Sequence, residues 1–323
     1  MTKRITYLDS LKAILILLVI LGHAVQFNTE EYETNPLFQF IYSFHMPLFL
    51  FISGYLTCRG CFKKWNIGKR ALQLLLPFIT WALISPFLES RAFTIKPFLY
   101  PDSGLWFLYN LFFYSVIANV SEWIESKKRI KLEYSFLLFY GLLGIFMLMF
   151  HTFFNCTQLL YHIPFFYAGY LWKRYDVALK STYLIGFMGG YFILLAMEMI
   201  PSCREFISHG IVKYLFTYGL KFLGMIMFFE LGRRYLNKEI PLLKSLGTMT
   251  LGIYACHFVI LHNLNSILAE LAYQQRVAVS FLLAAIISSF FVKIVSHISY
   301  IRTFLPLRCS SITSTSSLCF ISS

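Results

Sequence analysis

Charged side chains are scarce in this sequence of 323 residues, where they make up 13% of the total. Apolar residues account for 58%, and the mean hydropathy is +0.65. A single water-soluble core cannot use this much apolar surface, because soluble domains cover their cores with polar and charged residues. The scarcity of charge excludes an ordinary soluble domain and predicts a protein that crosses a membrane several times.

Acidic residues are scarcer than basic ones, 15 against 28, and the net charge is +13. A basic balance can indicate nucleic-acid binding, but the cations must then cluster on one domain. Here they recur in every second segment between apolar runs, at residues 3–12, 59–70, 127–131, 173–180, 233–244 and 302–308. Cytoplasmic loops show this enrichment, so we expect both termini in the cytoplasm and no nucleic-acid partner.

A cleavable signal and a cysteine framework are also missing. No short apolar segment with a small-residue cleavage site precedes the run 11–27, so we expect this run to be a retained helix. Cys58 and Cys61 form a CxxC pair without a second pair or a nearby histidine, which favours reduced thiols over a zinc site. Cys156 and Cys203 fall on expected outer loops, and the sequence leaves their pairing open.

Apolar runs of helical length are abundant. They lack the alternating pattern of barrel strands, so the expected fold is all-α, a polytopic transmembrane helical bundle with about ten spans. The expected spans are 11–27, 37–57, 71–88, 104–121, 134–150, 158–172, 181–200, 211–231, 247–268 and 278–300.

His23 lies near the end of the first apolar run. An ionisable side chain inside a membrane is costly and indicates a functional site, although a histidine that packs against a neighbouring helix is the alternative. Lys12 precedes it by 11 residues, which on a helix places the two roughly 16 Å apart and about 20° apart around the axis. One helix face therefore carries a cation at the membrane edge and an acid/base group deep inside.

Two further groups flank this face. Asp9 and Lys12 have the i,i+3 spacing of a helical ion pair, which could equally serve only as a membrane-edge anchor. The second span contributes another histidine, His45, followed by Pro47. Proline within a span loosens the helix, which is tolerated where neighbours satisfy the released backbone groups.

These pieces resemble the acyltransferase 3 family of membrane O-acyltransferases, especially members described as fucose 4-O-acetylase-like acetyltransferases. The opening "YLDSLKAILILLVILGH" is similar to the family's Arg-x10-His first helix, with Lys12 at the arginine position and His23 at the histidine position. "FHMPLFLFISGYL" resembles the family's second-helix signature. Later landmarks are "LWFLYNLF" at 105–112, "FYAGYLWKRY" at 166–175 and "LGTMTLGIYACH" at 246–257.

The resemblance covers about residues 4–300. It implies transfer of an acyl group, usually acetyl, from cytoplasmic acyl-CoA to a hydroxyl of a cell-surface polysaccharide or lipid-linked glycan precursor. The implied partners are acyl-CoA, a glycan or glycolipid acceptor and membrane lipid, with acetyl-CoA as donor substrate and no metal. The implied location is the bacterial plasma (inner) membrane. The family-like transmembrane domain would be 1–303, followed by a disordered Ser/Thr-rich tail, 304–323.

Three histidines follow from the resemblance as site residues. A histidine near neutral pKa can take the proton from an acceptor hydroxyl, so His23 is the expected general base. His257 matches the family's late histidine, and His45 lies in the second-helix signature. Both are expected to support His23.

The donor site is expected at the cytoplasmic mouth. Lys12, Lys69 and Arg70 suit the phosphates of CoA, and Asp9 would orient Lys12. The alternative for Lys69 is that it only keeps its loop in the cytoplasm, as basic residues in such loops generally do. Two positions depart from the family: Lys12 stands where arginine is usual, and Gln73 stands where a second arginine would follow Arg70.

Other readings stay open. A carrier or exporter of glycans or small solutes without acyl transfer would also suit intramembrane histidine and lysine, although no inverted repeat is obvious. A structural subunit would leave His23 unexplained. Lys221 and Glu198 could form a structural ion pair or contact substrate, and His162 and His297 are expected at the membrane interface.

Overall fold

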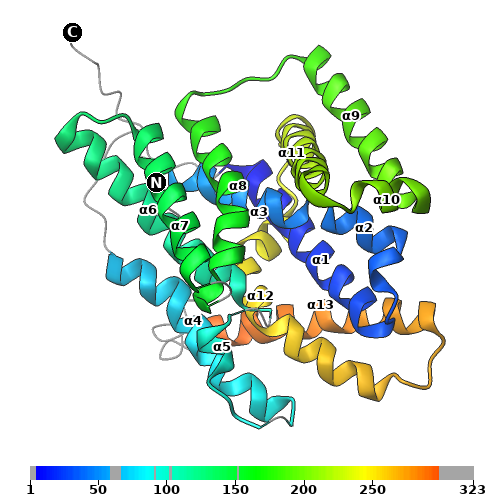
Figure 1. Cartoon of the computed structure of the whole chain (residues 1–323). Helices are drawn as coiled ribbons and strands as arrows, with labels where there is room; N and C mark the ends of the chain where they lie inside the picture. The colour runs from blue at the N-terminus through cyan, green and yellow to red at the C-terminus, as the bar shows by residue number, and fades with distance from the viewer. Residues whose placement is uncertain (1–4, 59–66, 91, 102–103, 151–152, 298–323) are drawn as a thin grey trace. The chain divides into compact units, whose positions relative to one another are not determined.

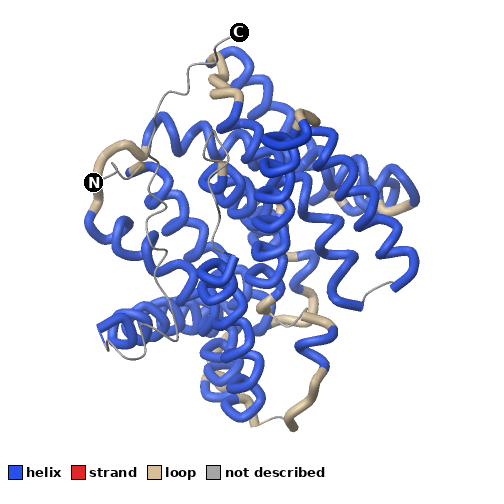
Figure 2. Tube along the Cα trace, turned by 90° about the vertical axis from the view of Figure 1, so that its left-hand side faces the viewer, coloured by secondary structure: helices blue, strands red, loops and turns tan. Residues whose placement is uncertain are grey.

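The computed structural model describes residues 5–58, 67–90, 92–101, 104–150 and 153–297. They form two compact units, each described here by itself. The α1 unit consists of Ile5–Phe49 and Ala178–His297, and the α6 unit consists of Leu50–Val177. Helices make up all the regular secondary structure of the described residues, and no strand occurs among them (Figures 1 and 2). The all-α prediction is confirmed.

The α1 unit holds most of the long helices. Its elements are α1 (Thr6–Asn28), the short 3₁₀ helix η1 (Tyr32–Thr34), α2 (Pro36–Tyr42), α9 (Ser181–Met199), α10 (Pro201–Ile207), α11 (Gly210–Tyr235), α12 (Pro241–Ile267) and α13 (Tyr273–His297). The α6 unit contains α4 (Ile67–Leu88), α5 (Lys96–Leu99), α6 (Trp106–Lys128), α7 (Leu132–Phe150), the 3₁₀ turn η2 (Phe153–Asn155) and α8 (Cys156–Arg174). Helix α3 (His45–Thr57) starts in the former and ends in the latter.

Eight helices in the described part of the chain are long and apolar enough to cross a membrane. They are α1, the pair α2 and α3 taken together, α4, α7, α9, α11, α12 and α13. The other two expected spans, 104–121 and 158–172, coincide with α6 and α8, which are 23 and 19 residues long but outside this set. The protein is therefore a multi-pass helical membrane protein.

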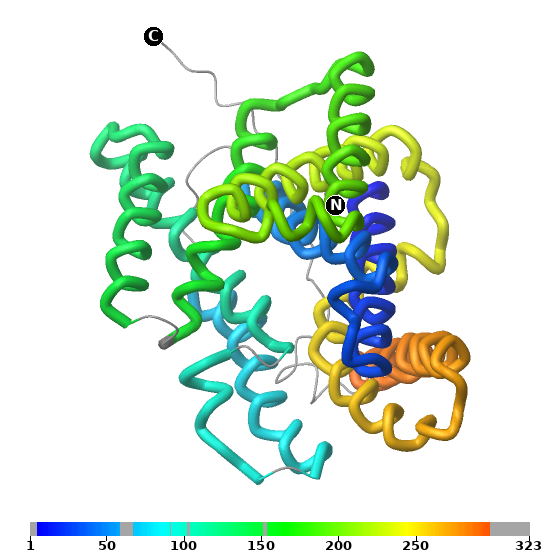
Figure 3. Tube along the Cα trace, turned by 45° about the vertical axis from the view of Figure 1, so that its right-hand side comes forward, coloured from blue at the N-terminus to red at the C-terminus, as the bar shows by residue number. Residues whose placement is uncertain are grey.

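Helix α1 packs against α12 and also contacts α2, α11 and α13. Figure 3 shows α1 in blue beside α12 in yellow and orange. At one end of the pair, a Cβ on Gly247 would lie 2.1 Å from the backbone oxygen of Asp9, so glycine permits backbone contact. At the other end, Phe27 meets Phe258 with ring centroids 4.9 Å apart. The first contact comes before the second in the sequence of both helices, so α1 and α12 run parallel.

The second span is interrupted. Ser43 and Phe44 separate α2 from α3, and Pro47 follows within the first turn of α3. The Ser43 hydroxyl, 2.7 Å from the backbone oxygen of Phe40, also lies 2.8 Å from the hydroxyl of Tyr191. The loosening expected from Pro47 is thus a break between α2 and α3. The Ser43 side chain satisfies one of the backbone oxygens near the break.

Glycines also set the packing of the α6 unit. A Cβ on Gly54 would lie 1.9 Å from the backbone oxygen of Phe166, and one on Gly169 would lie 1.9 Å from that of Phe51. The backbones of α3 and α8 therefore touch here, as small residues allow in membrane helices. Helix α6 contacts α4, α7 and α8.

Candidate functional site

The parallel packing of α1 and α12 brings two expected site residues together. The ring centroids of His23 and His257 lie 5.3 Å apart, with the ring planes inclined by 40°. The ring of Phe258 lies 5.4 Å from that of His23, edge to face. Residues separated by more than two hundred positions thus form one histidine pair inside the α1 unit.

His257 has a fixed orientation and one unused nitrogen. Its Nδ1 lies 2.7 Å from the backbone oxygen of Tyr254 and 3.2 Å from that of Ile253. Carbonyl oxygens only accept hydrogen bonds, so Nδ1 carries the proton and Nε2 carries the lone pair. The side chain is completely buried, and Nε2 has no hydrogen-bond partner among the described residues. A buried basic nitrogen without a partner suits a proton acceptor.

His23 is half-buried and held by its neighbours. Its Nδ1 lies 2.8 Å from Oε1 of Gln26, one turn further along α1, and 3.4 Å from the hydroxyl of Tyr42. With Nδ1 donating to the Gln26 oxygen, Nε2 of His23 is the basic nitrogen. Gln26 and Tyr42 were not singled out from the sequence, although the i,i+3 spacing of His23 and Gln26 indicates a shared helix face.

His45 also contacts Tyr42. The ring centroids of Tyr42 and His45 are 4.6 Å apart, and Nδ1 of His45 donates to the backbone oxygen of Ile41 at 2.7 Å. His45 is 2% exposed. The structure therefore gathers all three expected histidines around Tyr42 and α12 in one unit.

Asp9 and Lys12 form the ion pair that their spacing predicts, with Nζ 2.7 Å from Oδ1. Both side chains are largely buried. They lie at the end of α1 that contacts Gly247, whereas His23 lies toward the other end. On α1 the ion pair and the histidine pair therefore lie toward opposite ends of the helix, and their common face stays a prediction.

Lys69 and Arg70 belong to the α6 unit, at the start of α4. Lys69 is exposed, and Arg70 donates from Nη2 to the Ser115 hydroxyl at 3.2 Å. These two cations thus belong to a different unit from Lys12, which lies in the α1 unit.

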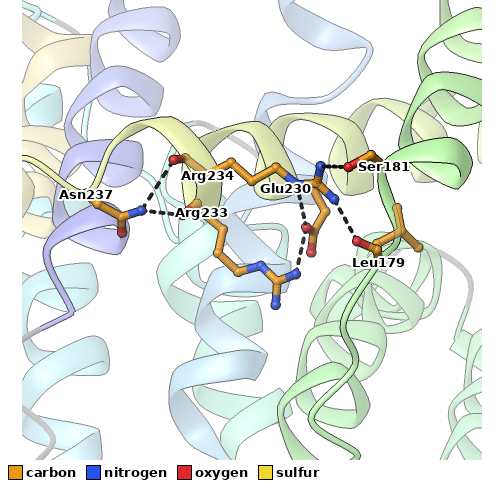
Figure 4. A network of polar contacts seen from close by, with 6 residues as sticks. All are labelled: Leu179, Ser181, Glu230, Arg233, Arg234 and Asn237. Atoms are coloured by element: carbon orange, nitrogen blue, oxygen red, sulfur yellow. Dashed lines mark hydrogen bonds and ion pairs between the residues drawn. The ribbon is translucent and has the colours of Figure 1, made fainter.

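A buried carboxylate at the end of α11 was missed (Figure 4). Glu230 is completely buried, and its Oε2 accepts from Nη2 of Arg233 at 2.8 Å and lies 3.6 Å from Nε of Arg234. Arg234 also donates to the Ser181 hydroxyl and to the backbone oxygen of Leu179, which joins the end of α11 to the start of α9. The i,i+3 and i,i+4 spacings could have indicated this network, but the arginines were assigned only to a cytoplasmic loop.

Two secondary expectations concern other polar residues. Lys221 lies near enough to Glu198 for the two charges to interact, and their role as a structural ion pair or as a substrate contact stays a prediction. His162 is buried within the protein and stacks on Trp106 with centroids 4.5 Å apart, and its expected place at the membrane interface stays a prediction.

The remaining expectations concern cysteines, metals and the tail. Cys203 is not bridged and so forms no disulfide with Cys156. Cys61 and the tail 304–323 lie outside the described residues. Across the described ranges, no three His, Cys, Asp or Glu side chains gather as a metal site would require.

Comparison with known proteins connects this geometry to a family. A family model described as an acyltransferase domain matches residues 5–298. Nodulation protein NolL of Mesorhizobium japonicum is 32% identical over 210 residues, which cover 56% of this chain and 55% of the relative. Nodulation protein NolL of Sinorhizobium fredii is 43% identical over 93 residues, which cover 26% of this chain and 25% of the relative.

The chain thus spans about half of one relative and a quarter of the other. No solved structure matches it. The family match includes every helix that carries the histidines and the Asp9–Lys12 pair, and it runs over nearly the whole chain. The protein therefore belongs to the acyltransferase 3 family of membrane acyltransferases.

Proposed function

We propose that the protein is a membrane-bound O-acyltransferase that moves an acetyl group from cytoplasmic acetyl-CoA to a hydroxyl of a cell-surface polysaccharide or lipid-linked glycan precursor. His23 is the general base in this proposal. The observation that carries it is the contact between the half-buried His23 and the buried His257, in each of which Nε2 is the ring nitrogen without the proton. Acyl transfer to a hydroxyl requires such a base.

The proposed step conserves protons and electrons. Nε2 of His23 takes the proton of the acceptor hydroxyl while the oxygen attacks the thioester carbonyl. The carbon–sulfur bond of the tetrahedral intermediate then breaks, and the departing CoA thiolate takes the proton back from the imidazolium. His257, 5.3 Å away between ring centroids, stays neutral and so adds no competing charge beside the imidazolium.

The donor's phosphates are assigned to cations at the cytoplasmic ends of the helices. Lys12 supplies a charge held in place by Asp9, and Lys69 and Arg70 supply charges in the α6 unit. Charge-assisted hydrogen bonds to phosphate are among the strongest available to a protein. Both relatives come from bacteria, which supports placement in a bacterial inner membrane.

The test is donor-dependent transfer. Membranes containing wild-type protein, His23→Ala or the control His209→Ala are incubated with acetyl-labelled acetyl-CoA and host glycolipid at matched protein levels. His209 is an exposed histidine, so its removal controls for loss of any imidazole. We expect label in glycan for wild type and His209→Ala, and a loss of at least about 100-fold for His23→Ala. Movement of glycan across the membrane without labelling would favour the carrier.

A further inference from the structure

The start of helices α6 and α8 in the α6 unit carries a group of polar and aromatic side chains that the proposed reaction does not use. Trp106 and Asn110 belong to the segment "LWFLYNLF" at 105–112, and they share one face of α6 because they are four residues apart. Asn155 and His162 come from the start of α8. The two pairs meet, Trp106 with His162 and Asn110 with Asn155.

The asparagine pair contains an unsatisfied donor. Asn110 is completely buried, and its Oδ1 accepts from Nδ2 of Asn155 at 3.3 Å. Nδ2 of Asn110 has no hydrogen-bond partner within the described part of the chain. A buried amide donor without a partner costs about 1–3 kcal/mol, and a water or a ligand that accepts its hydrogen bond removes this cost.

Asn155 forgoes its usual role to make this contact. It is the N-cap residue of α8, a position where asparagine side chains normally accept from the first amides of the helix. Its side chain makes no such bond, and its Nδ2 instead donates to Asn110 at 3.3 Å and to the backbone oxygen of Pro101 at 3.5 Å. Phe154 and Asn155 both have left-handed backbone angles, with φ of 53° and 57°, and such strain is tolerated best where function requires it.

The aromatic pair adds a second surface. Trp106 is half-buried, and its ring stacks on that of His162 with 29° between the planes. Nδ1 of His162 donates to the backbone oxygen of Gln158 at 3.0 Å, which fixes the ring. A partly exposed indole held rigidly offers an apolar face and costs little side-chain entropy on binding.

We propose that Trp106 and Asn110 form a carbohydrate subsite that binds a neutral sugar ring of the acceptor glycan. The C–H face of the sugar lies on the indole of Trp106, and a ring hydroxyl accepts from Nδ2 of Asn110. The four side chains include no lysine or arginine, which favours a neutral ring over an anion. The inference rests on the proposed function because it assumes a glycan acceptor.

The experiment measures binding without the reaction. Full-length protein in lipid nanodiscs is titrated with methyl glycosides of fucose, glucose and N-acetylglucosamine, and separately with inorganic phosphate, in the absence of acetyl-CoA. Variants are Trp106→Leu, which removes the aromatic face, Trp106→Phe, which keeps part of it, and Trp123→Leu. Trp123 is 45% exposed and lies near the other end of the same helix, so it is a matched control.

At least one glycoside is expected to bind saturably, with a Kd about tenfold weaker in Trp106→Leu, as for the loss of one stacking contact. Trp106→Phe recovers part of the affinity, and Trp123→Leu leaves it unchanged. Equal effects of Trp106→Leu and Trp123→Leu, binding of phosphate alone, or no binding of any glycoside would each overturn the proposal. Asn110→Ala gives the same comparison if Trp106→Leu does not fold.

The two proposals fail separately. Glycoside binding that depends on Trp106, in a protein that transfers no acetyl group, supports the subsite and contradicts the enzyme. Acetyl transfer by wild type with unchanged acceptor KM in Trp106→Leu contradicts the subsite alone. An increase of acceptor KM in that variant, with donor KM unchanged, supports both.

Discussion

The histidine group shows how much chemistry individual hydrogen bonds can specify. Backbone oxygens hold Nδ1 of His257 and of His45, and an amide oxygen holds Nδ1 of His23. Each imidazole is thereby presented with its basic nitrogen on the opposite side of the ring. His162 is held in the same way by the backbone oxygen of Gln158, so what distinguishes His23 and His257 is their contact with each other.

If His23 and His257 act as one unit, their effects on catalysis should not add. We expect His257→Ala to lower kcat about 100-fold, and His23→Ala, His257→Ala together to lose little more than His23→Ala alone. The measurement is the initial rate of label transfer at saturating donor. Losses that multiply in the double variant would show that the two histidines act independently.

Lys12 is expected to matter for stability as well as for the donor. Lys12→Met leaves the largely buried carboxylate of Asp9 without its partner and should destabilise the protein by about 3 kcal/mol. Lys12→Arg keeps the charge, and the double variant Asp9→Asn, Lys12→Met removes both charges. Thermal unfolding in detergent should show a lowered Tm for Lys12→Met only. A Tm lowered equally in the double variant would contradict the role of the ion pair.

At the scale of helices, close approach depends on residues without side chains. Gly54 and Gly169 let α3 touch α8, and Gly247 lets α12 touch α1. In lipid, such contacts replace the hydrophobic effect as the cause of helix association. A hydropathy profile does not predict these contacts between helices, because it describes one helix at a time.

Gly54→Ala should therefore destabilise the α6 unit by about 1–3 kcal/mol, since the new methyl would overlap the Phe166 carbonyl. Gly141 on α7 is the matched control, because a Cβ there meets no atom within 4 Å. Gly141→Ala should be neutral or stabilising by up to about 1 kcal/mol. Both are read from Tm in detergent, and a larger loss in Gly141→Ala would contradict the packing argument.

The sequence predicted single helices better than their partners. The end of α1 at Asn28 and the loosening at Pro47 follow from apolar length and backbone chemistry, whereas α1 begins at Thr6, five residues before the expected span 11–27. The contact between His23 and His257 depends on how α12 packs against α1, which no local pattern encodes. The network around Glu230 was not predicted for a related reason. It includes the contact of Arg234 with Ser181, which depends on how α11 packs against the start of α9.

At the scale of the whole molecule, the direction of the helices can be checked against the charge pattern. Basic residues predict that both termini lie in the cytoplasm. Counted from the N-terminus, α12 is then an odd-numbered span, both when α6 and α8 cross the membrane and when neither does. Odd-numbered spans run in the same direction as α1. The parallel packing of α1 and α12 agrees with this.

Single cysteines in a cysteine-free background test the orientation. Lys238→Cys, between α11 and α12, should react with a membrane-impermeant maleimide only after the cells are opened. Glu270→Cys, between α12 and α13, should react in intact cells. Both positions are exposed, so access through the membrane is the variable. The reverse pattern would invert the topology and place the donor cations outside.

The contact between Gly247 and Asp9 has a practical consequence for genetic studies of this protein. A bulkier residue at position 247 would push α12 away from α1 beside the Asp9–Lys12 pair, and the same helix carries His257 ten residues later. Such a mutant would lose activity and would map beside the proposed donor site. It would then be scored as a donor-binding defect, although the damage lies in the spacing of two histidines ten residues further along the helix.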